Sequence, residues 1–163
     1  MAKTARLSAG MLLYRRSDQG VEVLVGHMGG PFWARKDAGA WSIPKGEYDE
    51  HEDAQAAAFR EFEEELGAPA PAGTPICLGE VRQSGGKVVT VFALEGDFDE
   101  QAAVSNTFEM EWPKGSGVIK SFPELDRVAW LGLEAARTKL VKAQGAFLDR
   151  LHQHLEAPAR PGS

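Results

Sequence analysis

Residues 46–68 read GEYDEHEDAQAAAFREFEEELGA, and this stretch is the most informative part of the chain. From Gly46 to Gly67 it carries nine carboxylates and one full positive charge, Arg60, which gives a net charge of −8. The chain of 163 residues has a net charge of −6, so everything outside this segment carries only +2. The acidic excess is therefore concentrated in one short stretch, which indicates a local structural or functional role.

Residues 54–66 are predicted to form a helix, because Ala, Glu, Leu and Arg all favour it and Gly67 stands where a helix would end. On this helix Glu61, Glu64 and Glu65 share one face, since they are three and four residues apart. Like charges at this spacing destabilise a bare helix by about 0.2–0.5 kcal/mol per pair. A hard divalent cation would reverse that effect. From the helix alone, a solvated acidic face is an equally good interpretation.

The remaining pattern predicts an α/β sandwich with a mixed, largely antiparallel sheet flanked by helices. The expected strands are residues 7–14, 21–26, 41–43, 76–83, 87–95, 107–112 and 128–131, and residues 133–155 are expected to be helical with a break near Gly145. The first two strands should form a hairpin, and so should the strands on either side of residues 84–86. We expect a single domain over residues 1–156 and a disordered tail over 157–163.

Composition excludes several classes of protein. Hydrophobic residues make up 43% of the chain and charged residues 26%, which is typical of a globular protein and not of a disordered one. No apolar run approaches the roughly 20 residues that a membrane span needs, and no apolar signal segment follows Lys3 and Arg6. The single cysteine, Cys77, favours a reducing cytoplasm and is expected in the core. The pI of about 5.3 argues against a nucleic-acid partner.

The segment that begins at Gly46 resembles the Nudix box, G-x5-E-x7-R-E-U-x-E-E-x-G-U, in which U is a bulky apolar residue. Seven fixed positions match: Gly46, Glu52, Arg60, Glu61, Glu64, Glu65 and Gly67. Phe62 fits the first apolar position, and Ala68 is a small occupant of the last. The resemblance implies a Nudix-type α/β/α sandwich over most of the chain.

The resemblance also implies a reaction, which is hydrolysis of a nucleoside diphosphate linked to another moiety by attack of water on phosphorus. By position in the box, Glu61, Glu64 and Glu65 would hold Mg²⁺ or Mn²⁺. The carbonyl of Gly46 would be a further ligand, Glu52 would support the loop beside the metal, and Arg60 would orient a glutamate through an ion pair.

The general base is left open by the resemblance. Glu64 or Glu65 could serve from within the box, and Glu109 or Glu111 could serve from the later strand. For the last two, exposed strand charges are an equally good interpretation.

Trp41 to Gly46 read WSIPKG, which is similar to a segment of Nudix hydrolases of dinucleoside polyphosphates and diphosphoinositol polyphosphates. Lys45 is then a candidate phosphate contact. In the loop before it, an aromatic ring could stack on a base and cations could meet a polyphosphate. The candidate substrate-binding residues of this loop are Phe32, Trp33, Arg35 and Lys36. Ordinary packing explains the two aromatic residues equally well, and His27 is interpreted as structural or as a weak substrate contact.

The leading substrate hypothesis is a nucleotide polyphosphate, either a dinucleoside polyphosphate such as Ap4A or an NTP. The proline typical of ADP-ribose pyrophosphatases is absent, since Gln83 stands at its position. The alternative is a catalytically silent Nudix-fold sensor that binds a nucleotide or metabolite, which the complete set of box glutamates disfavours. A homodimer is left open, because many Nudix enzymes are dimers.

Overall fold

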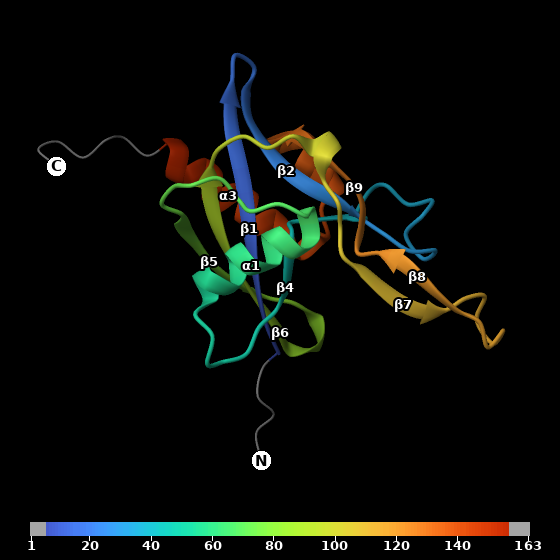
Figure 1. The fold of residues 1–163 in the computed structure, drawn as a ribbon. Helices are drawn as coiled ribbons and strands as arrows, with labels where there is room; N and C mark the ends of the chain where they lie inside the picture. Colours follow the sequence, from blue (N-terminus) through green and yellow to red (C-terminus); the bar gives the residue numbers. More distant parts are fainter. Residues whose placement is uncertain (1–5, 157–163) are drawn as a thin grey trace, which may run out of the picture.

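The computed structural model describes residues 6–156 and has a seven-stranded sheet with helices on both faces (Figure 1). The strands are β1 (Arg6–Ser17), β2 (Gly20–Met28), β3 (Trp41–Ser42), β4 (Lys45–Glu47), β5 (Ile76–Arg82), β6 (Lys87–Glu95), β7 (Thr107–Glu111), β8 (Ile119–Pro123) and β9 (Leu125–Gly132). The helices are α1 (Ala54–Leu66), α2 (Leu133–Lys139) and α3 (Gly145–Glu156). The expected mixed α/β sandwich is confirmed.

Strand β1 organises the sheet, whose order is β3-β2-β1-β6-β5, with β4 paired to β1 and β9 paired to β2. The end of β1 forms the expected hairpin with β2, and its beginning pairs with β4 at Ala9 and Gly46. Along its length β1 runs parallel to β6, whereas the other strand pairs are antiparallel. Because β2 leaves β1 free near its start, the short strand β4 fits there and brings Gly46 and its neighbours next to α1.

Alternate residues of β1 serve two separate cores, because successive strand residues point to opposite faces. Met11 and Leu13 pack with Phe62 and Leu66 of α1 on one face. Leu12 and Tyr14 belong to the other core, which α3 covers. The near-continuous apolar run at the start of the chain is thus explained by burial on both faces.

Helix α1 has the predicted bounds, residues 54–66. The side chain of Asp53 caps its N-terminus by accepting a hydrogen bond from the backbone N–H of Ala56. At the other end Gly67 adopts a left-handed conformation with φ of 78°, and its N–H donates to the carbonyl of Glu63. The side that carries Glu61 and Glu65 is buried rather than solvated. The interpretation of these two residues as part of a solvated face is therefore wrong.

Several segments differ from the expectation. Strands β4 and β8 were not predicted, because neither shows an apolar alternation, and the break in the C-terminal helical region spans Leu140 to Gln144. Cys77 is exposed, so its expected place in the core is wrong. It lies on β5, an edge strand on which Leu78 is buried and Cys77 points away. The tail expected over 157–163 lies outside the described residues, and among those described no helix is long and apolar enough to cross a bilayer.

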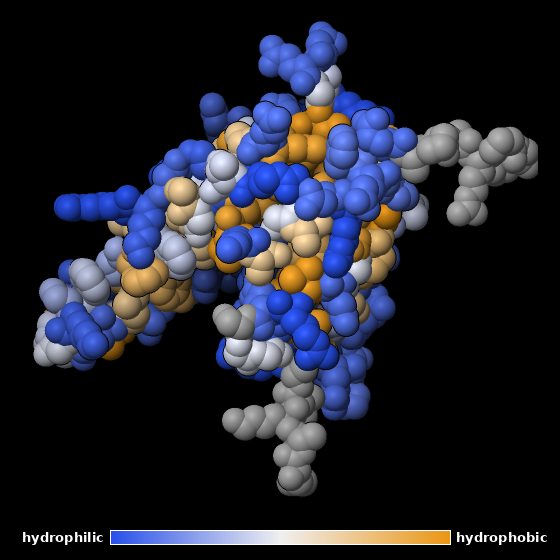
Figure 2. All heavy atoms as spheres, turned by 180° about the vertical axis from the view of Figure 1, so that it is seen from behind, coloured by the Kyte–Doolittle hydropathy of each residue, from blue (hydrophilic) through white to orange (hydrophobic). Residues whose placement is uncertain are grey.

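Strands β7 and β8 form a separate two-stranded hairpin that projects from the body (Figure 1). Seen from behind, this projection carries apolar surface among polar side chains (Figure 2). Its exposed apolar residues are Trp112, Val118 and Ile119. The hairpin meets the body where Phe108 approaches Gly30, so it stands beside the loop of residues 29–39.

Substitution of Gly67 by alanine should destabilise the fold by about 2–3 kcal/mol. A Cβ there would add the strain of a left-handed residue and would lie 2.5 Å from the carbonyl oxygen of Val104. Gly145→Ala is the matched control, because Gly145 is helical and has open space around it. This control should keep or slightly raise the free energy of unfolding, measured in urea. Equal effects of the two substitutions would contradict the account of the helix end.

Candidate active site

A cleft of about 400 Å³ opens where β4, α1 and the beginning of β9 come together. Its walls carry charges of both signs. The acidic residues that line it are Glu47, Glu61, Glu65 and Glu124, and the basic ones are Arg6, Lys45 and Lys87. The structure thus gathers side chains from distant parts of the sequence around the acidic helix.

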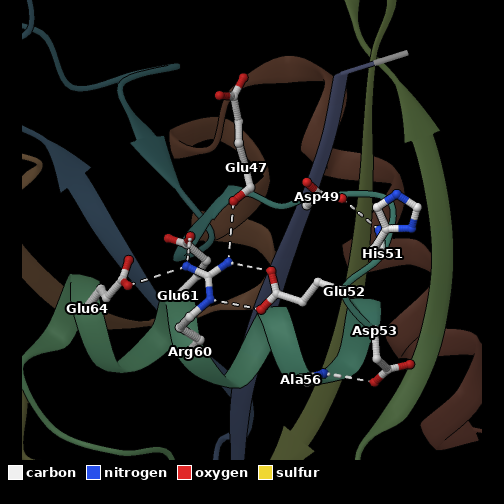
Figure 3. A network of polar contacts seen from close by, with 9 residues as sticks. All are labelled: Glu47, Asp49, His51, Glu52, Asp53, Ala56, Arg60, Glu61 and Glu64. Carbon is white, nitrogen blue, oxygen red and sulfur yellow. Dashed lines mark hydrogen bonds and ion pairs between the residues drawn. The ribbon is translucent and has the colours of Figure 1, made fainter. Parts of the chain in front are cut away.

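Arg60 lies at the centre of a polar network at the side of this cleft (Figure 3). Its guanidinium donates two hydrogen bonds to the carboxylate of Glu52, from Nε and from Nη2, each 2.9 Å long. Its Nη1 donates to Glu61 over 2.8 Å and to Glu64 over 3.3 Å. Arg60 holds the pKa of Glu52 below its usual range, and the paired carboxylates raise the pKa of Arg60. One cation therefore fixes three glutamates of the segment.

Gly46 allows the close approach of Glu61 to β4. A Cβ on Gly46 would lie 2.0 Å from Oε2 of Glu61, which is far inside any contact distance. The carboxylate of Glu61 can occupy this position because residue 46 has no side chain. Burial is the main reason that the pKa of Glu61 is raised, and the carboxylate of Glu64 adds to it.

Glu124 is a functional candidate that the sequence analysis missed. It lies between β8 and β9 and lines the cleft with Glu65. Burial, and next the negative charge of Glu124, raise the pKa of Glu65 to about 8. The backbone N–H of Glu124 donates to the carbonyl of Asn106, which closes the base of the projecting hairpin. No local pattern marks this residue, because only the hairpin connection carries it to the cleft.

Lys45 and Lys87 form the basic part of the cleft. Burial, and next the positive charge of Lys87, lower the pKa of Lys45 to about 8. The ion pairs nearby join Arg6 to Glu47 and Arg60 to its glutamates, so both lysines lack an ion-pair partner among residues 6–156. Two neighbouring cations without a counter-ion are relieved by a bound anion. Lys87 was also missed, because it reaches the cleft only through the pairing of β6 with β1.

The donor atoms suit a hard divalent cation, although they are not yet gathered around one point. Within residues 6–156, no three acidic, histidine or cysteine side chains are close enough to form a ready-made metal site. Glu61 and Glu65 nevertheless present buried carboxylates to the cleft, and Glu64 lies one turn along the helix from Arg60. Carboxylate oxygens are the ligands that Mg²⁺ and Mn²⁺ prefer. The residues present therefore fit such an ion, and Arg60 holds the carboxylates of Glu61 and Glu64 through hydrogen bonds.

Other candidate residues lie farther from the cleft. The loop of residues 29–39, which contains Arg35, connects β2 to β3. Met28 and Ser42 of these strands line the cleft, but residues 29–39 do not. Phe32 is 63% exposed, whereas Trp33 packs against the core below the loop.

The two glutamates suggested from the later strand also stand apart. Glu109 and Glu111 are exposed on β7 of the projecting hairpin, and Glu111 accepts a hydrogen bond from the N–H of Gly115. Glu124 is closer to the acidic helix than the hairpin tip is, since it lines the same cleft as Glu65.

Residues 4–151 match the family model of the NUDIX domain. A search of curated proteins finds no match for this chain.

Several solved structures share the fold. A C. elegans Ap4A hydrolase, in a binary complex, has a TM-score of 0.63 at 22% identity, over 91% of this chain and 97% of that one. The NUDIX domain of Shewanella oneidensis NrtR, complexed with ADP ribose, has a TM-score of 0.65 at 17% identity, over 94% and 90%. The MutT protein from Methanosarcina mazei Go1 has a TM-score of 0.59 at 20% identity, over 96% and 99%. At these identities the likeness concerns the fold.

Substitution of Gly46 by alanine should weaken binding of Mn²⁺ by tenfold or more while the protein stays folded. The added Cβ would push the carboxylate of Glu61 out of its place, and a flexible side chain can move at little cost. Gly132→Ala is the control, since a Cβ there meets nothing within 4 Å. Calorimetric titration with Mn²⁺ measures the affinity, and urea unfolding should change by about 1 kcal/mol or less. Unchanged affinity would contradict the role of Gly46.

Proposed function

Because this chain belongs to the Nudix family and is a hydrolase of phosphoanhydride bonds, we propose that it cleaves a nucleotide polyphosphate with the help of Mg²⁺ or Mn²⁺. The preferred substrate in this proposal is a dinucleoside polyphosphate such as Ap4A, with an NTP as the next candidate. We further propose that it works in the cytoplasm, in keeping with its single cysteine, and that two copies can associate.

The observation that carries the proposal is the mixed charge of the cleft. Buried carboxylates of Glu61 and Glu65 stand in the same hollow as the two unpaired lysines, Lys45 and Lys87. A polyphosphate with bound divalent cations has the complementary arrangement, since it offers metal charge to the glutamates and phosphate oxygens to the lysines. A site for a neutral metabolite would require neither the buried carboxylates nor the unpaired lysines.

The residues of the chain have separable roles in this reaction. Glu61, Glu64 and Glu65 would hold the cations, with Gly46 as a further backbone ligand. When bound, the metal would offset negative charge on the pyrophosphate and would lower the pKa of the attacking water. A carboxylate oxygen of Glu64 or Glu65 would accept the proton of that water.

Supporting roles fall to the neighbouring residues. Arg60 keeps the carboxylates in position through four hydrogen bonds of 2.8–3.3 Å, and Glu52 fixes Arg60 in turn. Glu124 faces the same space and is a better-placed candidate base than Glu109 or Glu111.

The number of basic residues in the cleft favours a substrate with more than one phosphate. Arg6, Lys45 and Lys87 all line the cleft, and Lys45 and Lys87 are left free for phosphate oxygens because Glu47 already pairs with Arg6. At the rim, the loop with Phe32 and Arg35 would meet the nucleoside at one end of the substrate. Among proteins of this fold, one is an Ap4A hydrolase by name, in keeping with such a substrate.

Glu65→Gln should lower kcat by two orders of magnitude or more, since it removes a charge that metal and water both require. Glu63→Gln, on the exposed side of the same helix, should keep kcat within twofold. The measurement is release of phosphate-containing products from diadenosine polyphosphates, NTPs, ADP-ribose and diphosphoinositols, with Mg²⁺ or Mn²⁺.

Two results of this panel would count against the proposal. Full activity of the Glu65→Gln protein would overturn the metal assignment. No turnover of any substrate by the wild-type protein would favour the alternative, a binding module that recognises a nucleotide without cleaving it.

Lys87→Ala should raise KM for the polyphosphate about tenfold and change kcat less, because a charge-assisted contact to phosphate is worth about 1.5–3 kcal/mol. Lys120→Ala is the matched control, since Lys120 lies on the exposed hairpin outside the cleft. Steady-state kinetics of both variants on the best substrate decide the matter. Equal KM values would show that Lys87 does not contact the phosphates.

A further inference from the structure

His27 is a buried histidine whose two ring nitrogens both have a partner. It lies on β2, between Trp41 of β3 and Arg127 of β9, and its side chain is completely buried. Its Nδ1 is 2.8 Å from Oδ1 of Asp126, and its Nε2 is 2.7 Å from the backbone carbonyl oxygen of Lys36. The ring therefore joins the sheet to the middle of the loop of residues 29–39.

The nature of these partners shows how the ring is protonated. A backbone carbonyl can only accept a hydrogen bond, so Nε2 of His27 carries a hydrogen. His27 thus donates from Nε2 to the loop, and the contact of Nδ1 with Asp126 holds the other side of the ring.

The carbonyl that His27 holds belongs to the residue that organises the loop. The ammonium of Lys36 lies 3.5 Å from the ring centre of Phe32 and 5.3 Å from that of Trp33. Phe32 and Trp33 themselves are in edge-to-face contact. The bond to His27 therefore anchors the backbone from which this cation reaches both aromatic rings.

The ends of the loop are held separately. Met28 donates to the carbonyl of Ala40, and Gly29 donates to that of Glu124. Trp41 donates from its indole to Asp37, which also pairs with Lys139 of α2. The contacts of Met28 and Gly29 hold the ends, those of Asp37 hold the residue after Lys36, and His27 holds the carbonyl of Lys36 itself.

We propose that His27 is a positioning residue for the substrate, which acts by holding the loop of residues 29–39 at the rim of the cleft. The inference rests on the proposed function, because it takes the loop as the part that meets the nucleoside end of a nucleotide polyphosphate. Asp126 has a second role in this arrangement. It lines a neighbouring hollow of about 330 Å³ together with Glu65, so the tether of the loop ends beside the acidic helix.

The first test separates the tether from activity. In His27→Gln, one amide group cannot reach both Asp126 and the carbonyl of Lys36, so the loop should loosen. Trypsin cleavage after Arg35 and Lys36, followed by mass spectrometry, should become at least tenfold faster. His51→Gln is the control, because the side chain of His51 is 87% exposed and lies in another loop. Unchanged cleavage in the folded His27→Gln protein would overturn the tether.

The second test examines the hydrogen bond to the loop directly. Nitrogen NMR of the wild-type protein should show a hydrogen on Nε2 of His27, because its partner is a carbonyl oxygen. This measurement uses no variant, so it guards against a misfolded His27→Gln. A bare Nε2 in the wild-type protein would overturn the tether.

The third test connects the tether to the substrate. His27→Gln should raise KM for the best polyphosphate by fivefold or more and keep kcat within about threefold, a separation that general loss of stability would not produce. A loosened loop with wild-type KM would overturn the positioning role. If the wild-type protein cleaves no substrate of the panel, the proposed function fails, and the positioning role fails with it. The tryptic and NMR results then still decide whether the tether itself exists.

Discussion

The interaction on which the candidate site depends is the set of hydrogen bonds from Arg60 to three glutamates. Three carboxylates on one side of a helix repel each other, and burial of two of them makes the charged forms costlier still. Arg60 offsets this cost with a rigid planar fork, which a lysine could not supply in the same geometry. The same contacts tie α1 to the loop before it through Glu52. The arrangement explains how the chain can carry nine carboxylates in 22 residues and still pack α1 against its core.

Strand β4 is very short, yet it positions both acidic and basic groups of the cleft. Lys45 and Gly46 are neighbours on a strand, so their Cα substituents face opposite sides of the sheet. On one side the missing side chain of Gly46 admits Glu61 of α1. On the other side the lysine reaches Lys87, which β6 contributes through its parallel pairing with β1. Carboxylates and ammonium groups thus stand around one strand edge, and Lys45 and Glu65 each favour the charged form of the other.

The sequence predicted the parts of this structure that depend on local signals. Helix α1 follows from composition and from Gly67, and the two hairpins follow from short turns between apolar strands. Strand β4 has no apolar residue, and β8 interrupts its pattern with a lysine and a serine, so neither could be read from periodicity. Glu124 and Lys87 lie far from the box in sequence and reach the cleft only through strand pairing. The place of Cys77 depends on β5 being an edge strand, which no local pattern reveals.

The net charge of −6 acquires a physical meaning from this geometry. The chain outside the acidic segment carries +2, and two of its cations, Lys45 and Lys87, lie unpaired beside the glutamates. A bare polyanion would be repelled by the glutamates, and a bare metal ion would meet the lysines. Binding of either ligand lowers the electrostatic free-energy cost of binding the other. Cations on the glutamates leave the lysines free to attract phosphate. A cleft built in this way therefore favours metal and polyphosphate together over either one alone.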